Sequence, residues 1–195
     1  MSTFQLYLTL GIHHIVDLNA YDHILFIVTL CAVYTFSQWK DVLVLITAFT
    51  IGHSLTLALA TLNLIHVSTN LIEFLIPVTI FITALSNVLQ KSGKVLHKRH
   101  IFKYFAAMFF GLIHGLGFSN YLRSLLGQED NLIGPLFSFN VGIEIGQIII
   151  VAAIMLITWI LVNFLHVKRR DWILILSGAA MGVSLIMIIE RAGAL

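Results

Sequence analysis

The chain has 195 residues, of which 59% are hydrophobic and 10% are charged, and its mean hydropathy is +0.98. Soluble domains carry about 25% charged residues, so this composition excludes a water-soluble fold and indicates a single integral membrane domain over residues 1–195. The formal net charge of +2 does not favour nucleic acid as a partner. The single cysteine, Cys31, excludes an intramolecular disulfide and a cysteine-rich metal site. Any metal must therefore be held by nitrogen and oxygen ligands.

Apolar runs bounded by polar clusters predict an all-α, polytopic membrane helix bundle with about seven transmembrane helices. Five runs are long enough to cross a bilayer: residues 43–62, 71–89, 101–122, 136–165 and 172–189. The first two runs, 4–18 and 22–36, each provide about 23 Å of helix against a hydrocarbon core of about 30 Å. They form either two short helices joined at 19–21 or one broken helix.

Lysine and arginine gather in two segments, 91–103 and 168–170, which the positive-inside rule assigns to the cytoplasm. Counting helices outward from these segments places 38–41 in the cytoplasm, and places 63–70 and the 19–21 junction outside. With seven helices, the N-terminus is cytoplasmic and the C-terminus is external. We expect the chain to lie in a bacterial cytoplasmic (inner) membrane, with the lipid bilayer as its surrounding partner. The sequence leaves open whether the chain forms a homo-oligomer.

Three pairs of glycines have the four-residue spacing that lets helix backbones approach closely in lipid. The pairs are Gly111/Gly115, Gly142/Gly146 and Gly178/Gly182. We expect each pair to serve helix packing.

Ionisable side chains inside a membrane are costly, by about 2.5–3.5 kcal/mol each on insertion scales, and usually face the bundle interior. With the orientation above, those of this chain fall in the outer half of the bilayer, which favours one site that opens to the exterior. Histidines and carboxylates without thiolates suit nickel, cobalt or zinc rather than calcium or magnesium. The predicted metal ligands are His14, Asp22, His23, His53, His114 and Glu144.

Hydrogen-bonding side chains accompany these ligands along the helices. Asn140, Glu144 and Gln147 stand at i, i+4 and i+7, so they share one helical stripe. Thr50 shares a helix face with His53, which makes its hydroxyl a candidate partner for the imidazole. The expected supporting residues are Thr50, Ser54, Glu73, Asn140 and Gln147.

Four motifs follow one another in a characteristic order. They are GIHHI (11–15) with YDHILF (21–26), TIGHSLTL (50–57), FGLIHGLGF (110–118) and FNVGIEIGQ (139–147). Together they resemble the HupE/UreJ family of membrane proteins, over nearly the whole chain. The resemblance implies a nickel or cobalt permease in which His14, Asp22, His23 and His114 handle the metal. Hydrogenase-linked members have a tighter spacing before the Asp-His pair and an acid soon after His-Gly, so this chain resembles a divergent branch.

Two functions stay open at this stage. In the first, a permease captures a divalent transition metal from the exterior, although the inner halves of its helices offer few polar groups for an onward path. In the second, an intramembrane zinc-dependent metalloenzyme, a hydrolase or acyl transferase, acts on a lipid or lipoprotein, with Glu144 or Asp22 as general base. The metal is nickel, cobalt or zinc in either case, and we favour the permease.

Overall fold

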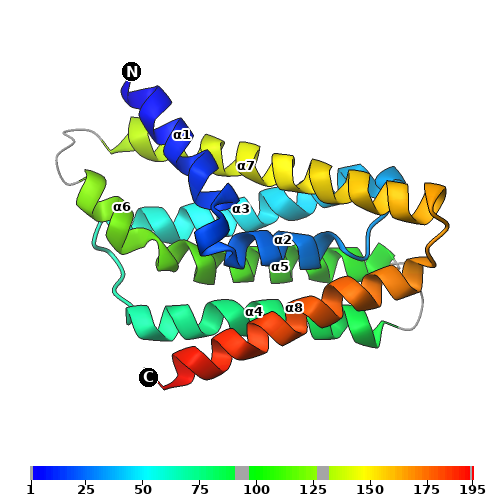
Figure 1. Cartoon of the computed structure of the whole chain (residues 1–195). Helices are drawn as coiled ribbons and strands as arrows, with labels where there is room; N and C mark the ends of the chain where they lie inside the picture. Colours follow the sequence, from blue (N-terminus) through cyan, green and yellow to red (C-terminus); the bar gives the residue numbers. More distant parts are fainter. Residues whose placement is uncertain (1, 91–96, 127–131, 194) are drawn as a thin grey trace.

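The computed structural model describes residues 2–90, 97–126, 132–193 and 195, and over these residues the chain is helical without strands. The prediction of an all-α helix bundle is therefore confirmed (Figure 1). The α-helices are α1 (Thr3–Val16), α2 (Asp22–Cys31), α3 (Trp39–Thr61), α4 (Thr69–Leu89), α5 (His97–Gly117), α6 (Ser119–Leu126), α7 (Ile133–Trp159) and α8 (Arg169–Ala192).

The five long spans expected from the sequence are present in the described part of the chain. α3, α4, α7 and α8 are each long and apolar enough to cross a membrane, and α7 continues into the π-helical turn η3 (Ile160–Phe164). α5 and α6 together provide the fifth span, which is bent by 53° between Gly117 and Ser119. At this bend the Ser119 hydroxyl donates to the Leu116 carbonyl (2.8 Å). The bend interrupts the predicted 101–122 helix.

Of the two arrangements left open for the first 36 residues, the structure favours one broken span. α1 starts beside the start of α7, where the Ser138 hydroxyl donates to the Phe4 carbonyl, and Gly146 of α7 lies against Ile15 near the end of α1. α2 then continues in the same general direction, and the Arg169 guanidinium at the start of α8 donates to the Val33 carbonyl just beyond α2. Helices of about 21 and 15 Å are each too short to span about 30 Å but suffice in series.

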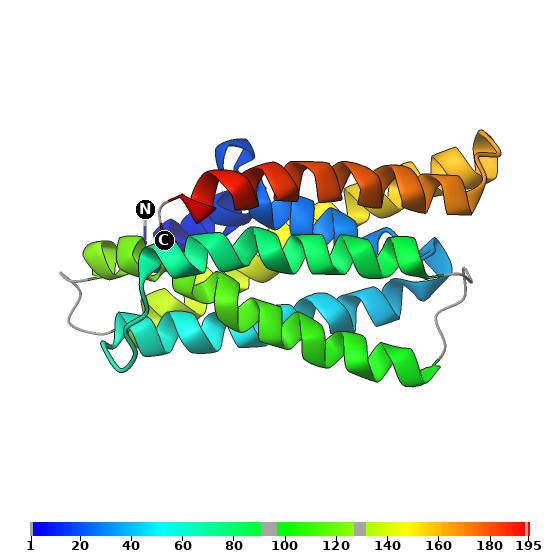
Figure 2. The same cartoon turned by 90° about the horizontal axis from the view of Figure 1, so that it is seen from below.

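This broken span corrects the predicted topology. The first residues of α1 and the last residues of α8 lie at the same end of the bundle (Figures 1 and 2), so the expected opposite placement of the two termini is wrong. The 19–21 junction, formed by the 3₁₀ turn η1 (Leu18–Ala20) and its C-cap Tyr21, is exposed on the side of the bundle, part-way along its length and not at either end. We call the end where α3, α5 and α8 begin the basic end, and the other the far end. Residues 91–96 of the predicted basic segment lie outside the described residues.

Two pairs of parallel helices owe their close approach to glycine. In the α3/α5 pair, a Cβ on Gly52 would lie 2.1 Å from the Met108 carbonyl oxygen, and one on Gly111 would lie 2.1 Å from that of Phe49. In the α1/α7 pair, a Cβ on Gly142 would lie 2.2 Å from the Leu8 carbonyl oxygen. Without a Cβ at these positions the backbones pack directly on one another, as the small-residue spacing predicts.

The third pair, α4 and α8, is held at both ends by arginines. At the basic end, the Arg170 guanidinium donates to the carbonyls that close α4, those of Asn87, Val88 and Gln90. At the far end, Arg191 donates to the Glu73 carbonyl (2.6 Å). This pair does not use its glycines, because a Cβ on Gly178 or Gly182 would meet nothing within 4 Å. Within the described chain, Gly178 and Gly182 therefore do not have the expected role in packing one helix against another.

The glycine geometry predicts opposite outcomes for two matched substitutions. We expect Gly111→Ala to lower the free energy of unfolding by about 1–3 kcal/mol, because the added methyl group forces α3 and α5 apart. Gly182→Ala adds the same methyl group into open space and is expected to be neutral or to gain up to about 1 kcal/mol of helix propensity. Thermal unfolding in detergent measures both. Equal destabilisation by the two variants would contradict this packing.

The broken span predicts which ends share a side of the membrane. In a Cys31→Ser background, cysteines at Ser2 and Leu64 are expected to react with an impermeant maleimide from one side of sealed vesicles, and a cysteine at Leu165 from the other. All three positions are exposed in the structure. Labelling of the Ser2 cysteine from the same side as the Leu165 cysteine would contradict the broken span and would favour α1 and α2 as two helices that each cross the membrane.

Candidate metal centre

Three histidines from three different helices meet inside the bundle. His14 lies near the end of α1, His23 in the first turn of α2, and His53 in the half of α3 toward the far end. One ring nitrogen from each lies within 4.8 Å of the other two. Nitrogens bound tetrahedrally to one ion at about 2.0–2.1 Å stand about 3.4 Å apart, so the most widely spaced rings need to approach by roughly 1 Å. This histidine cluster is a candidate metal site.

Four ring nitrogens of the cluster are buried and have no hydrogen-bond partner in the described part of the chain. These are Nε2 of His14, Nε2 of His23 and both ring nitrogens of His53, although His53 is 0% exposed. A buried polar group without a partner costs roughly 1–3 kcal/mol, and native proteins rarely leave several together. The unmet lone pairs indicate that the cluster is built to receive a ligand.

Asp22 supports the cluster through His23. As the first residue of α2, its Oδ1 accepts the backbone N–H of His23 (2.8 Å) and also its Nδ1–H (3.0 Å). With Nδ1 protonated, the lone pair lies on Nε2, which is the unpartnered nitrogen. A carboxylate on the far side of a histidine fixes its orientation and raises its basicity as a metal ligand. Asp22, which we predicted as a metal ligand, therefore contacts His23 and orients its ring in this structure.

His114 of α5 lies beside the cluster but is not one of its three close members. Its ring centroid is 5.4 Å from that of His23, and its Nε2 is 3.0 Å from the Thr79 hydroxyl oxygen. Because Thr79 donates its own proton to the Ile76 carbonyl (2.7 Å), His114 Nε2–H is the donor, and the unpartnered Nδ1 holds the lone pair. Nothing in the sequence pattern singles out Thr79, since it reaches His114 from another helix.

A cavity of about 590 Å³ connects the histidines with the far end of the bundle. His14, His23 and His114 line its inner part, whereas Glu73, Tyr121 and Arg191 line it where α4 and α6 meet the end of α8. Glu73, which we expected as a supporting residue, therefore faces the approach to the cluster. The cavity is also lined by the acid Asp17 and by His13.

Aromatic rings close the cluster on its other side. Three histidines each have a phenylalanine about one helical turn away on the side toward the basic end. Phe26 lies beside His23 in this way, Phe49 beside His53 and Phe110 beside His114. Phe26 and Phe49 are buried, their ring centroids are 5.0 Å apart, and they lie 5.0 and 5.3 Å from that of His114. We call these three residues the aromatic layer.

Glu144 lies apart from the cluster, contrary to its prediction as a ligand. It is half-buried and accepts a hydrogen bond from the Thr47 hydroxyl of α3 (2.7 Å). The rest of its stripe also faces α3, because Gln147 accepts from Thr50 and Asn140 accepts from Ser54, both at 2.7 Å.

These three hydrogen bonds form a polar ladder between α3 and α7. They satisfy Thr50 and Ser54, so neither hydroxyl supports the imidazole of His53, as the shared helix face had suggested. The ladder residues Thr47, Thr50 and Ser54 lie on α3 away from the cavity, none of them among its lining residues. Their geometry indicates a role in joining the two helices.

The fold and the cluster agree with a comparison of the sequence with known families. The profile of the family described as "HupE / UreJ protein" matches residues 1–191, nearly the whole chain. This protein is therefore an integral membrane protein of the HupE/UreJ family. No curated protein and no solved structure matches the chain.

The cluster predicts a metal-dependent gain in stability that depends on His53. A ligand that binds only the folded state stabilises it by about 2.7 kcal/mol at about 100 times its Kd. We expect nickel or cobalt to raise the unfolding temperature of the purified protein, and His53→Leu to abolish this shift without lowering the metal-free unfolding temperature, because it removes a buried group with two unpartnered nitrogens.

The matched control is His166→Leu, which changes an exposed histidine at the basic end. This variant should keep the full metal-induced shift. Loss of the shift in both variants, or in neither, would contradict a site at the histidine cluster.

Proposed function

We propose that this protein carries nickel or cobalt across the cytoplasmic membrane of a bacterium, with the ion held midway by His14, His23 and His53. The family to which the chain belongs is associated with nickel and cobalt transport. The observation that carries the proposal is the meeting of three buried imidazoles with unpartnered nitrogens within 4.8 Å of one another. Zinc suits the same ligands, and the choice among the three metals rests on the family.

The cavity supports entry of the ion from the far end. The positive-inside rule, applied to Arg169 and Arg170, supports a cytoplasmic basic end and therefore a cavity that opens to the exterior. Glu73 and Asp17 along the cavity favour cations over anions at the entrance. The ion then reaches His14 and His23 from the same cavity.

Release toward the cytoplasm requires the aromatic layer to move. Imidazole ligands without thiolate hold nickel and cobalt less tightly than cysteine sites do, which suits a site that must release its ion. Phe26 and Phe49 are fully packed beneath the cluster in this structure, so the state described is open to the far end only. His114, between the cluster and this layer, is the next nitrogen ligand along the route.

Uptake of nickel or cobalt into proteoliposomes containing a metal-sensitive dye tests the proposal. We expect wild type and His166→Leu to take up metal and His53→Leu to take up none. Asp22→Asn should lower the apparent affinity about 10- to 100-fold, because the amide holds His23 less firmly and lowers its basicity. Metal binding without any uptake by wild type would exclude a permease.

The alternative, an intramembrane zinc enzyme, is favoured by one observation: the lining of the cavity reaches His14, His23 and His114 but includes no residue of the aromatic layer. Three histidines with an open position match the ligand set of catalytic zinc sites, and zinc when bound there would supply an activated water. Because Glu144 is not among the residues that line the cavity, Asp17, Asp22 and Glu73 are the acids near such a site. One tightly held zinc per chain with no transport would favour this function.

A further inference from the structure

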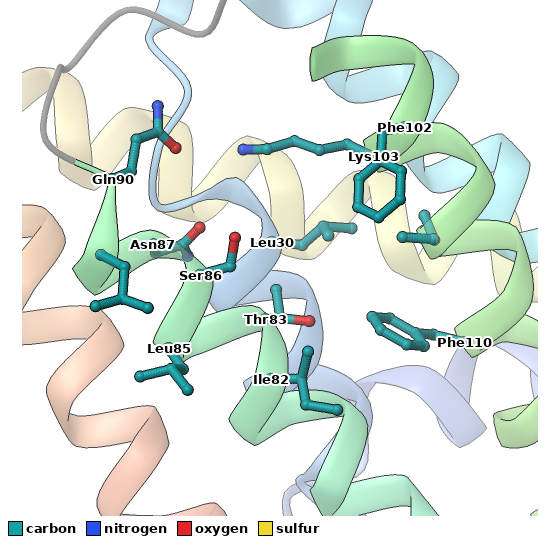
Figure 3. A pocket seen from close by; sticks show the side chains of 13 residues that line it. Leu30, Ile82, Thr83, Leu85, Ser86, Asn87, Gln90, Phe102, Lys103 and Phe110 are labelled. Atoms are coloured by element: carbon teal, nitrogen blue, oxygen red, sulfur yellow. The ribbon is translucent and has the colours of Figure 1, made fainter.

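A second cavity, of about 680 Å³, lies between α4 and α5 in the half of the bundle toward the basic end. It is separate from the histidine cluster, since none of His14, His23 and His53 is among its lining residues. Its volume lies within the range of roughly 300–1,000 Å³ that small-molecule sites occupy. Figure 3 shows it as a space bounded by α4 on one side and α5 on the other, with Leu30 of α2 behind.

The cavity opens toward the lipid. Ile82 and Phe102, which line it from α4 and α5, are 50% and 75% exposed, so its mouth lies on the outer surface of the bundle. From Ile82 to Gln90 it follows about 12 Å of α4. An occupant can therefore enter sideways from the bilayer without crossing the protein.

The lining changes character along this length. The part nearer the bundle centre is largely apolar, with Ile82, Leu85, Ala107 and Phe110 beside the hydroxyl of Thr83. The part at the basic end carries the polar side chains Ser86, Asn87, Gln90 and Lys103. Figure 3 shows Lys103 extending from α5 across the cavity toward Gln90 at the end of α4.

Two cations, Lys103 and Arg170, lie at this polar end. The Lys103 ammonium lies 5.4 Å from the centre of the Tyr34 ring, and the Arg170 guanidinium lies on the last carbonyls of α4, those of Val88 and Gln90. A negative group beside Lys103 is therefore attracted by two cations at the level where a lipid headgroup sits. An apolar slot with a cationic end matches an acyl chain with an anionic headgroup.

We propose that this cavity binds an anionic phospholipid of the leaflet at the basic end, with an acyl chain between α4 and α5 and the phosphate beside Lys103. A bound acyl chain fills the space between α4 and α5 at the basic end. At the far end the two helices meet closely through Gly117 and Ile76. The lipid thus completes the packing of α5 against α4. The proposal does not depend on metal transport.

Native mass spectrometry of the metal-free protein tests the proposal, with phosphatidylglycerol and phosphatidylcholine of identical chains as probes. We expect phosphatidylglycerol to be retained preferentially. Lys103→Gln should weaken its binding about fivefold, the effect of one cation near a charged headgroup, with little effect on phosphatidylcholine. Lys40→Gln is the matched control, because Lys40 lies at the same end on α3, outside the cavity, and should have no effect.

A second pair of variants tests the apolar part of the cavity. Ala106→Leu adds volume at a lining residue and should lower retention of both lipids, whereas Ala152→Leu, on the exposed face of α7, should not. Equal retention of the two lipids by wild type, or loss of phosphatidylglycerol in Lys40→Gln as much as in Lys103→Gln, would overturn the proposal. So would unchanged lipid binding in Lys103→Gln together with altered metal uptake, which would identify the cavity as the inner part of the metal route.

Discussion

The structure depends on an interruption of the first membrane span. Irregular backbone is tolerated at membrane depth only where it is buried in protein or lines a polar cavity. Here Asp17 accepts the backbone N–H (2.9 Å) and the side-chain amide (3.0 Å) of Asn19, and Asp17 and Ala20 line the cavity. The interruption allows α2 to begin inside the bundle. Asp22 and His23 therefore lie at the depth of His14 and His53 instead of at a membrane boundary.

Close helix packing then fixes where the histidines point. Gly52 and Gly111 bring α3 and α5 into backbone contact, and Gly11 and Gly142 do the same for α1 and α7. The two pairs run in opposite directions across the bundle and leave α2 between α4, α7 and α8. Because His14, His53 and His114 stand on these glycine-packed helices, small changes in helix spacing would move all three rings relative to His23.

The polar residues of the membrane segments fall into two groups that differ in hydrogen bonding. In the ladder between α3 and α7 the hydroxyls of Thr47, Thr50 and Ser54 each donate to a residue of α7, and the Gln147 amide nitrogen is the ladder atom left buried without a partner among the described residues. In the histidine cluster, in contrast, four ring nitrogens are buried without partners among the described residues. Satisfied polar groups stabilise helix association in lipid, whereas unsatisfied ones destabilise the protein unless a ligand binds. This difference, and not polarity alone, separates the candidate site from the scaffold.

The sequence by itself determined the membrane class, the five long helices, the family and the identity of the histidines, because hydropathy and motif spacing are local properties of the chain. It also limited the ligands to nitrogen and oxygen through the single Cys31. Only the tertiary structure decided that α1 and α2 form one span, that His14, His23 and His53 meet, and that Glu144 faces Thr47 instead. Spacing along the sequence shows which residues share a helix face. Which helix that face contacts depends on how the helices rotate and pack, and the contacting residues can be far apart in the chain, as Thr47 of α3 and Glu144 of α7 are.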